Sequence, residues 1–175
     1  MMEVVLDSFE IASGGTQPVL GAVRDKLLEP FIAATCAALG EMASTEVVVR
    51  AVYQETHHHP LGELAAVLEL RSTTEGALVL SFPRRTAAAL AGRILAGVTE
   101  EVDEPLVRDC VGEIANVVAG QAKAMLAGTP YRFAFSMPKG VAGAQEFLPQ
   151  PGLDCLVVAF SSEQGEFALQ LFLKR

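Results

Sequence analysis

The sequence predicts an α+β fold in which an antiparallel β-sheet of about six strands packs against long helices. Segments with the apolar spacing of helices alternate with groups of strand-like segments, in the order α-βββ-αα-βββ. Short, turn-rich connections join neighbouring strand segments, as they do in hairpins. Runs of strands separated by runs of helices are typical of α+β proteins.

The first helical segment extends from about Pro18 to Ala43, and Pro30 lies inside it. A proline removes one hydrogen bond of a helix, and its ring clashes with the preceding turn. We therefore expect a lead-in helix that ends near Leu28 and a main helix that begins at Pro30. The domain organisation follows this division: residues 1–28 form a lead-in whose role the sequence does not indicate, and residues 29–175 form one domain.

Strand propensity and alternation predict the remaining elements in chain order. The first three strands are expected at residues 46–54, 64–71 and 77–82, and the last three at 131–137, 153–161 and 167–173. Two helices lie between these groups, at residues 86–95 and 103–126, and glycines follow both. The segment 138–151 is rich in proline and glycine, which predicts a loop.

Composition excludes several classes of function. The chain has 51% hydrophobic and 19% charged residues, a net charge of -8 and a pI near 4.9. Nucleic acid is a poor candidate partner, because phosphate binding needs clustered Lys and Arg. Neither a secretory signal nor a run of roughly 20 apolar residues is visible. We expect a cytoplasmic protein that does not contact a membrane, with Cys36, Cys110 and Cys155 as reduced core thiols.

Other motifs carry little chemistry. His57, His58 and His59 are consecutive and cannot all point one way, so we interpret them as part of an exposed loop rather than a metal site. The pair Arg84 and Arg85 is interpreted as the start of a helix, although it could also touch an acidic partner. Nucleotide-binding and serine-hydrolase motifs are absent from the sequence. We expect neither a cofactor nor a metal site.

The helix at residues 103–126 is the most informative segment. At about 100° per residue, its polar residues fall within roughly 80° of one another. These residues are Asp109, Glu113, Asn116, Gly120 and Lys123. The opposite face is the expected core stripe, formed by Val107, Val111, Ile114, Val118, Ala122 and Met125.

Such a polar face has two interpretations. Every amphipathic helix has one, so Glu113 and its neighbours could be solvated charges without a function. Against this, Asn costs several tenths of a kcal/mol and Gly about 1 kcal/mol relative to Ala inside a helix. Gly120 also removes a side chain beside Asn116, which lets the backbone of another molecule come close. A docking partner would account for both residues.

The pattern Asp109-x-x-x-Glu113-x-x-Asn116-x-x-x-Gly120 resembles the signature helix of the CheC/CheX/FliY chemotaxis phosphatases. The surrounding residues are most similar to the CheX branch. The resemblance extends from residue 29 to residue 173. It includes Glu29-Pro30-Phe31, residues 76–83 and Ser136-Met137-Pro138.

This resemblance implies a phosphatase that hydrolyses the aspartyl-phosphate of a CheY-like response regulator. Asn116 would hold the attacking water, and Glu113 would pair with the active-site lysine of the receiver domain. Asp109, Gly120 and Lys123 would contact the partner, and Mg²⁺ would belong to the receiver.

The chain contains one such motif, because residues 33–38 of the first main helix lack the polar pair that CheC-like members carry. A single motif fits the CheX branch, whose similarity implies a homodimer joined through sheet edges. The alternative is a non-catalytic adaptor of the same fold that binds a receiver domain or a flagellar switch component.

Overall fold

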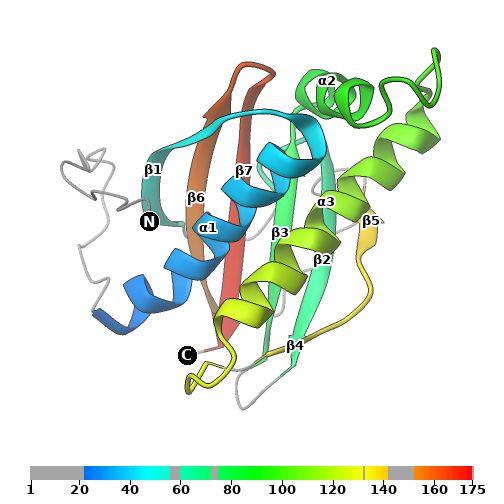
Figure 1. Ribbon diagram of the computed structural model, residues 1–175. Helices are drawn as coiled ribbons and strands as arrows, with labels where there is room; N and C mark the ends of the chain where they lie inside the picture. Colours follow the sequence, from blue (N-terminus) through cyan, green and yellow to red (C-terminus); the bar gives the residue numbers. More distant parts are fainter. Residues whose placement is uncertain (1–21, 56–59, 72–74, 132, 142–151, 175) are drawn as a thin grey trace.

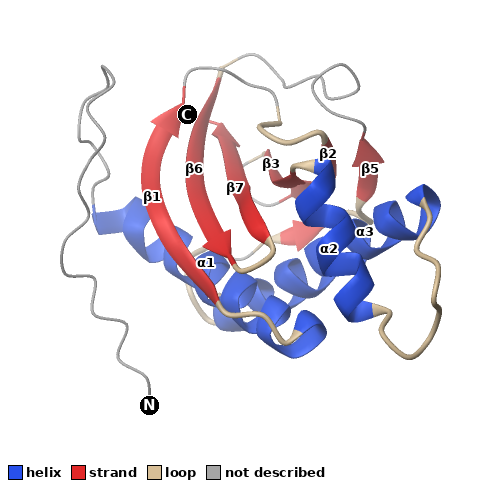
Figure 2. Cartoon of the chain, turned by 90° about the horizontal axis from the view of Figure 1, so that it is seen from above, coloured by secondary structure: helices blue, strands red, loops and turns tan. Residues whose placement is uncertain are grey.

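The computed structural model describes residues 22–55, 60–71, 75–131, 133–141 and 152–174. Within them, α1 (Ala22–Ala43), α2 (Arg84–Ile94) and α3 (Glu104–Met125) lie on one side of a seven-stranded sheet (Figures 1 and 2). Every strand pairing in this sheet is antiparallel. The predicted α+β class is confirmed.

The sheet has the order β1-β6-β7-β3-β2-β4, and β5 also pairs with β2. The long strands are β1 (Val47–Glu55), β2 (Leu64–Arg71), β3 (Gly76–Phe82), β6 (Leu153–Ser162) and β7 (Gly165–Lys174). The C-terminal hairpin β6–β7 therefore occupies the middle of the sheet (Figure 1). It separates β1 from β2, which follows β1 in the chain.

The sequence prediction is wrong at the edge beyond β2. Only Ala134–Phe135 of the segment 131–137 forms a strand, β4. The expected loop 138–151 contains a further strand, β5 (Lys139–Val141). Both short strands exist because β2 offers them backbone partners, Leu70 for Phe135 and Val67 for Lys139. The sheet thus has seven strands instead of about six, in the order α-βββ-αα-ββββ.

The expected helix break before Pro30 is also wrong, because α1 runs without interruption from Ala22 to Ala43. A proline in a helix interior costs about 3 kcal/mol. However, Leu27, Leu28 and Phe31 on either side of it are at most 5% exposed. Each such buried side chain contributes roughly 1.5–3 kcal/mol, which outweighs the lost bond. The division at residue 29 therefore falls inside α1, and residues 1–21 lie outside the described part of the chain.

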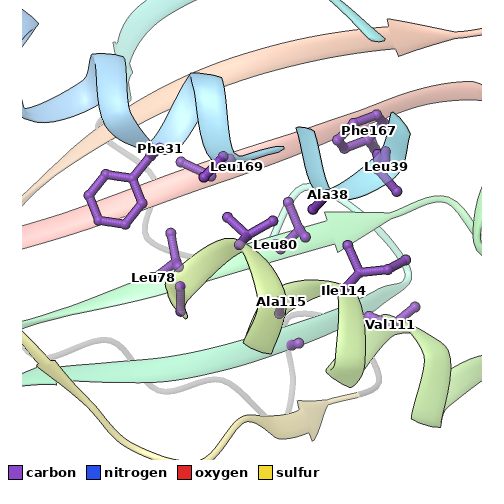
Figure 3. Packing of buried hydrophobic residues seen from close by; sticks show 14 of the residues in the cluster. Phe31, Ala38, Leu39, Leu78, Leu80, Val111, Ile114, Ala115, Phe167 and Leu169 are labelled. Atoms are coloured by element: carbon purple, nitrogen blue, oxygen red, sulfur yellow. The ribbon is translucent and has the colours of Figure 1, made fainter. Parts of the chain in front are cut away.

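The main core lies between the helices and the sheet. Phe31 and Leu39 of α1, Ile114 of α3, and Leu78 and Leu80 of β3 belong to this core. In Figure 3, Leu39 lies beside Phe167 of β7. Alternate residues of the strands face the other way and form a smaller cluster, which we call the second face of the sheet. Its buried members are Ala65, Val67, Val79, Leu153, Cys155, Val157, Ala168 and Phe172.

Local signals fix the ends of α3. Asp103 caps the N-terminus, where its Oδ1 accepts a hydrogen bond from the Leu106 N–H at 3.0 Å. Glu104 in the first turn forms ion pairs with Arg84 and Arg108. The helix ends at the C-cap Leu126, and Gly128 then adopts a φ of +82°. These contacts hold α3 across the sheet, and the side of the helix turned away from the sheet stays exposed.

The remaining sequence predictions concern cysteines and membrane contact. Cys36, Cys110 and Cys155 are all free thiols, and the last two are buried. None of the described helices is long and apolar enough to span a membrane.

Candidate docking helix

The structure places all five predicted site residues on the exposed face of α3. Asp109, Glu113, Asn116, Gly120 and Lys123 are each exposed, and they share the side of the helix that faces away from the sheet. In Figure 1 this face of α3 lies in the outermost layer of the molecule, with α1 on one flank and β5 on the other. We call these five residues the docking face.

The predicted core stripe is correct except at one position. Val107, Val111, Ile114, Val118 and Ala122 are all buried. Met125, in contrast, is 47% exposed, because it is the last residue of the helix and the next residue, Leu126, enters the core instead. The stripe is also wider than predicted, since Cys110, Ala115 and Ala119 are buried as well. Packing against both α1 and β5 explains this width.

Glu113 and Asn116 have no side-chain hydrogen bond or ion pair with any residue that the structure describes. The ion pairs of α3 gather at its first turn, around Glu104. The carboxamide of Asn116 therefore keeps two donors and one acceptor available to another molecule. Asn116 is also the only asparagine in the 175-residue chain.

Two glycines flank Asn116 along the helix, Gly112 four residues before it and Gly120 four residues after it. A Cβ added at either position would meet no heavy atom within 4 Å. The fold itself therefore does not require glycine there, although each costs about 1 kcal/mol relative to alanine. Bare backbone on both sides of Asn116 leaves room for a close partner. The sequence interpretation missed Gly112, for which the i−4 spacing from Asn116 was the available signal.

The docking face does not form a complete catalytic centre by itself. Cys110 belongs to the same helix but is buried, and burial, together with the negative charge of Asp109, raises the pKa of its thiol. A neutral, buried thiol is not a nucleophile. Among the described residues, no three His, Cys, Asp or Glu side chains gather in a way that could hold a metal ion. The exposed groups of the docking face can donate or accept hydrogen bonds and pair with charges, and could in this way bind and position another molecule.

The other motifs resolve as follows. His57, His58 and His59 lie outside the described residues. Arg84 has the structural role that we favoured: it pairs with Glu104 of α3, and its N–H donates to Glu63 at 2.9 Å. In α1, the hydroxyl of Thr35 is buried and bonds to the Phe31 carbonyl at 2.7 Å, so residues 33–38 form no second docking face.

Comparisons with known proteins decide the family. The model for the chemotaxis phosphatase CheX matches residues 64–161, which are more than half of the chain and include all of α3. The chain belongs to the CheX family. A comparison with curated proteins found no match.

Solved structures of CheX-like proteins share the fold. A putative chemotaxis protein from Desulfovibrio vulgaris Hildenborough is 25% identical with a TM-score of 0.75, covering 85% of this chain and 97% of that one. CheX from Desulfovibrio desulfuricans is 23% identical with a TM-score of 0.76, covering 85% and 99%. The CheX–CheY–BeF3–Mg²⁺ complex from Borrelia burgdorferi contains a match at 19% identity and a TM-score of 0.66, covering 85% and 98%.

Proposed function

We propose that this protein hydrolyses the aspartyl-phosphate of a CheY-like response regulator. The observation that carries the proposal is the state of Asn116: an uncharged carboxamide without a side-chain partner in the described part of the chain, exposed on α3 between two bare backbone positions. Membership of a phosphatase family and the likeness to a CheX solved in complex with CheY support it.

Asn116 enters the active site of the receiver and holds a water in line with the phosphorus. The water oxygen bonds to phosphorus, the bond from phosphorus to the aspartate oxygen breaks, and the products are the aspartate carboxylate and inorganic phosphate. Holding the water and the phosphoryl group in one geometry lowers the barrier because orientation is established before reaction. The Mg²⁺ that neutralises charge on the phosphoryl oxygens belongs to the receiver.

The other four residues of the docking face hold the receiver. Glu113, one turn from Asn116, pairs with the active-site lysine of the receiver and fixes the docked orientation. Asp109 and Lys123 contact its rim with opposite charges, and Gly120 lets its backbone approach. Because a protein that acts on such a receiver must share its compartment, we also propose a cytoplasmic location. We further propose a homodimer joined through sheet edges.

Decay of a phosphorylated receiver, with and without this protein, tests the proposal. Asn116→Ala is expected to slow the catalysed decay by about 10²-fold or more, since it removes a group that positions the water. Asn116→Asp should be nearly as damaging, because a carboxylate repels the phosphoryl group. Glu163→Gln, an exposed residue of the β6–β7 turn, is the control that keeps full activity.

Binding must be measured in parallel, because an adaptor would use the same face. Since Asn116 is the only asparagine, labelling that residue type with ¹⁵N gives a single side-chain ¹⁵N resonance. This signal should shift when the receiver bound to BeF₃⁻ is added. If the Asn116 signal shifts but the phosphorylated receiver decays no faster, only the adaptor function remains. If the signal does not shift and the decay is no faster, both functions are excluded.

A further inference from the structure

A cavity of about 230 Å³ opens on the second face of the sheet. Ser81 of β3, Ala159 of β6 and Ala168 of β7 line it, together with Arg50, Leu61 and Glu166. The neighbours of Ser81 in the strand, Leu80 and Phe82, belong to the core beneath the helices. The alternation of a strand therefore turns Ser81 to the opposite side from the docking face.

A cross-strand row of small side chains creates the hollow. Strand register places Ala51 opposite Ala159, Ala159 opposite Ala168, Ala168 opposite Ser81, and Ser81 opposite Ala65. Four of the five side chains are single methyl groups, and the three central residues of the row, Ala159, Ala168 and Ser81, form the floor of the cavity. Segment 60–63 forms a wall, where the Leu61 N–H donates to Gln170 Oε1 at 3.3 Å. Gly62 approaches Phe82 so closely that an added Cβ would lie 2.5 Å from its backbone.

The hydroxyl of Ser81 is the unusual group in this floor. Ser81 is 1% exposed, and its Oγ has no hydrogen-bond partner among the residues that the structure describes. A buried hydroxyl left unpaired costs about 1–3 kcal/mol, so most buried hydroxyls are bonded. A molecule in the cavity that accepts or donates a hydrogen bond would remove this cost.

Two opposite charges line the same cavity. Arg50 occupies a β-bulge, at the register shift between Val49 and Ala51, and a bulge re-aims a side chain. Arg50 and Glu166 are both exposed, and neither forms an ion pair within the described part of the chain. A guanidinium binds carboxylates in a two-pronged geometry, whereas a carboxylate binds ammonium groups.

We propose that this cavity binds a small zwitterion of the α-amino acid class. Its carboxylate pairs with Arg50, its ammonium group pairs with Glu166, and Ser81 completes the hydrogen bonding near the small floor. The volume is below the roughly 300–1,000 Å³ of drug-sized sites and suits a single amino acid. This site does not depend on the proposed phosphatase function, because it lies on the other face of the sheet.

The test is binding of the twenty L-amino acids to the full chain, by thermal shift and then calorimetry. At least one should bind, and both its amide and its desamino analogue should bind at least tenfold more weakly. Arg50→Gln and Glu166→Gln should each weaken binding about tenfold or more, the value of a charge-assisted hydrogen bond. Arg85→Gln and Glu163→Gln are the matched controls, which should bind as the wild type does.

Ser81→Ala separates this proposal from simple loss of structure. It should leave the melting temperature of the free protein unchanged or higher, because an unpaired buried hydroxyl is removed. The same variant should weaken amino-acid binding several-fold. The proposal is overturned if none of the twenty amino acids binds, or if Ser81→Ala binds its ligand as tightly as the wild type.

Discussion

Single residues of this protein differ sharply in how much of their hydrogen-bonding capacity the fold uses. The side chains of Thr35 and Asp103 form hydrogen bonds with backbone groups of the same molecule. Asn116 has no such partner among the described residues, and its exposed position on α3 gives it access to another protein. An uncharged side chain that is left unpaired in solvent costs the fold little, and this explains how the chain can reserve it for a partner.

Cys155 shows the opposite situation, a group that the fold holds in one protonation state. Burial raises the pKa of its thiol to about 12 from an ordinary value of 9.0, although a hydrogen bond from Gln170 opposes this. The unfolded chain ionises this thiol near pH 9, whereas the folded chain does not. The contribution of the neutral Cys155 thiol to the free energy of unfolding is therefore complete below pH 9 and is lost as the pH rises toward 12.

This difference can be measured with Cys155→Ala. We expect the variant to be less stable than the wild type at pH 8, because it leaves a cavity. The difference in the free energy of unfolding between the wild type and this variant should shrink above pH 9, by up to about 1.4 kcal/mol per pH unit. Denaturant titrations at several pH values provide the measurement. A gap that stays constant from pH 8 to pH 11 would contradict the assignment.

At the scale of elements, Gly112 and Gly120 make α3 less stable than a helix with alanine at these positions would be. Gly112→Ala and Gly120→Ala should each stabilise the protein by up to about 1 kcal/mol, because neither added methyl group meets another atom. Both should weaken receiver binding, since the methyl groups occupy the space on either side of Asn116. Denaturation and receiver titrations check the two effects separately.

The matched control for these glycines is Gly92→Ala. Gly92 is also exposed, lies in a helix, α2, and has open space around it. This variant should gain similar stability and bind the receiver as the wild type does. If all three variants bind the receiver normally, the glycines have no role in docking.

The side chain of Arg93 links α2 to the C-terminus of α1. Its Nε donates to the Ala43 carbonyl at 2.6 Å, and its Nη2 donates to the Ser44 carbonyl at 2.9 Å. These carbonyls lie at the C-terminus of α1, where a positive charge is favourable, and Ser44 adopts a φ of +47° as the helix ends.

Arg93→Met should therefore lower the free energy of unfolding by about 1.5–3 kcal/mol, the range for hydrogen bonds to charged groups. Urea denaturation measures this loss. Phosphatase activity of the folded variant should be retained, because Arg93 is not on the docking face. A stability equal to that of the wild type would show that solvent replaces both hydrogen bonds.

At the scale of the whole molecule, the two edges of the sheet differ. On one side, β1 is a nine-residue strand whose one partner among the described strands is β6, and Val48 on it is 43% exposed. On the other side, β4 and β5 have two and three residues. Short strands blunt an edge, whereas a long open edge favours pairing with another chain.

We therefore expect the proposed homodimer to form through β1. Light scattering should give twice the 18.5 kDa mass of one chain. The outward amide groups of β1 should exchange with solvent more slowly as protein concentration rises, because dimerisation protects them. A mass of one chain at all concentrations would exclude the dimer, and protection confined to β5 would move the interface to the other edge.

Several elements followed from local sequence alone. The segment predicted at 103–126 corresponds to α3 with its two caps, and β2 has the predicted limits. The five polar residues of α3 were correctly expected to face solvent. Periodicity reports which residues are buried, and capping residues report where a helix ends, so these features do not depend on distant parts of the chain.

Only the tertiary structure decided the rest. Pro30 remains inside α1 because the leucines before it reach a core made by distant strands. Lys139–Val141 form a strand because β2 lies beside them. The floor of the hollow around Ser81 needs β3, β6 and β7 in one register. Each of these outcomes depends on contacts between residues far apart in the sequence, and their free energy can exceed any local preference.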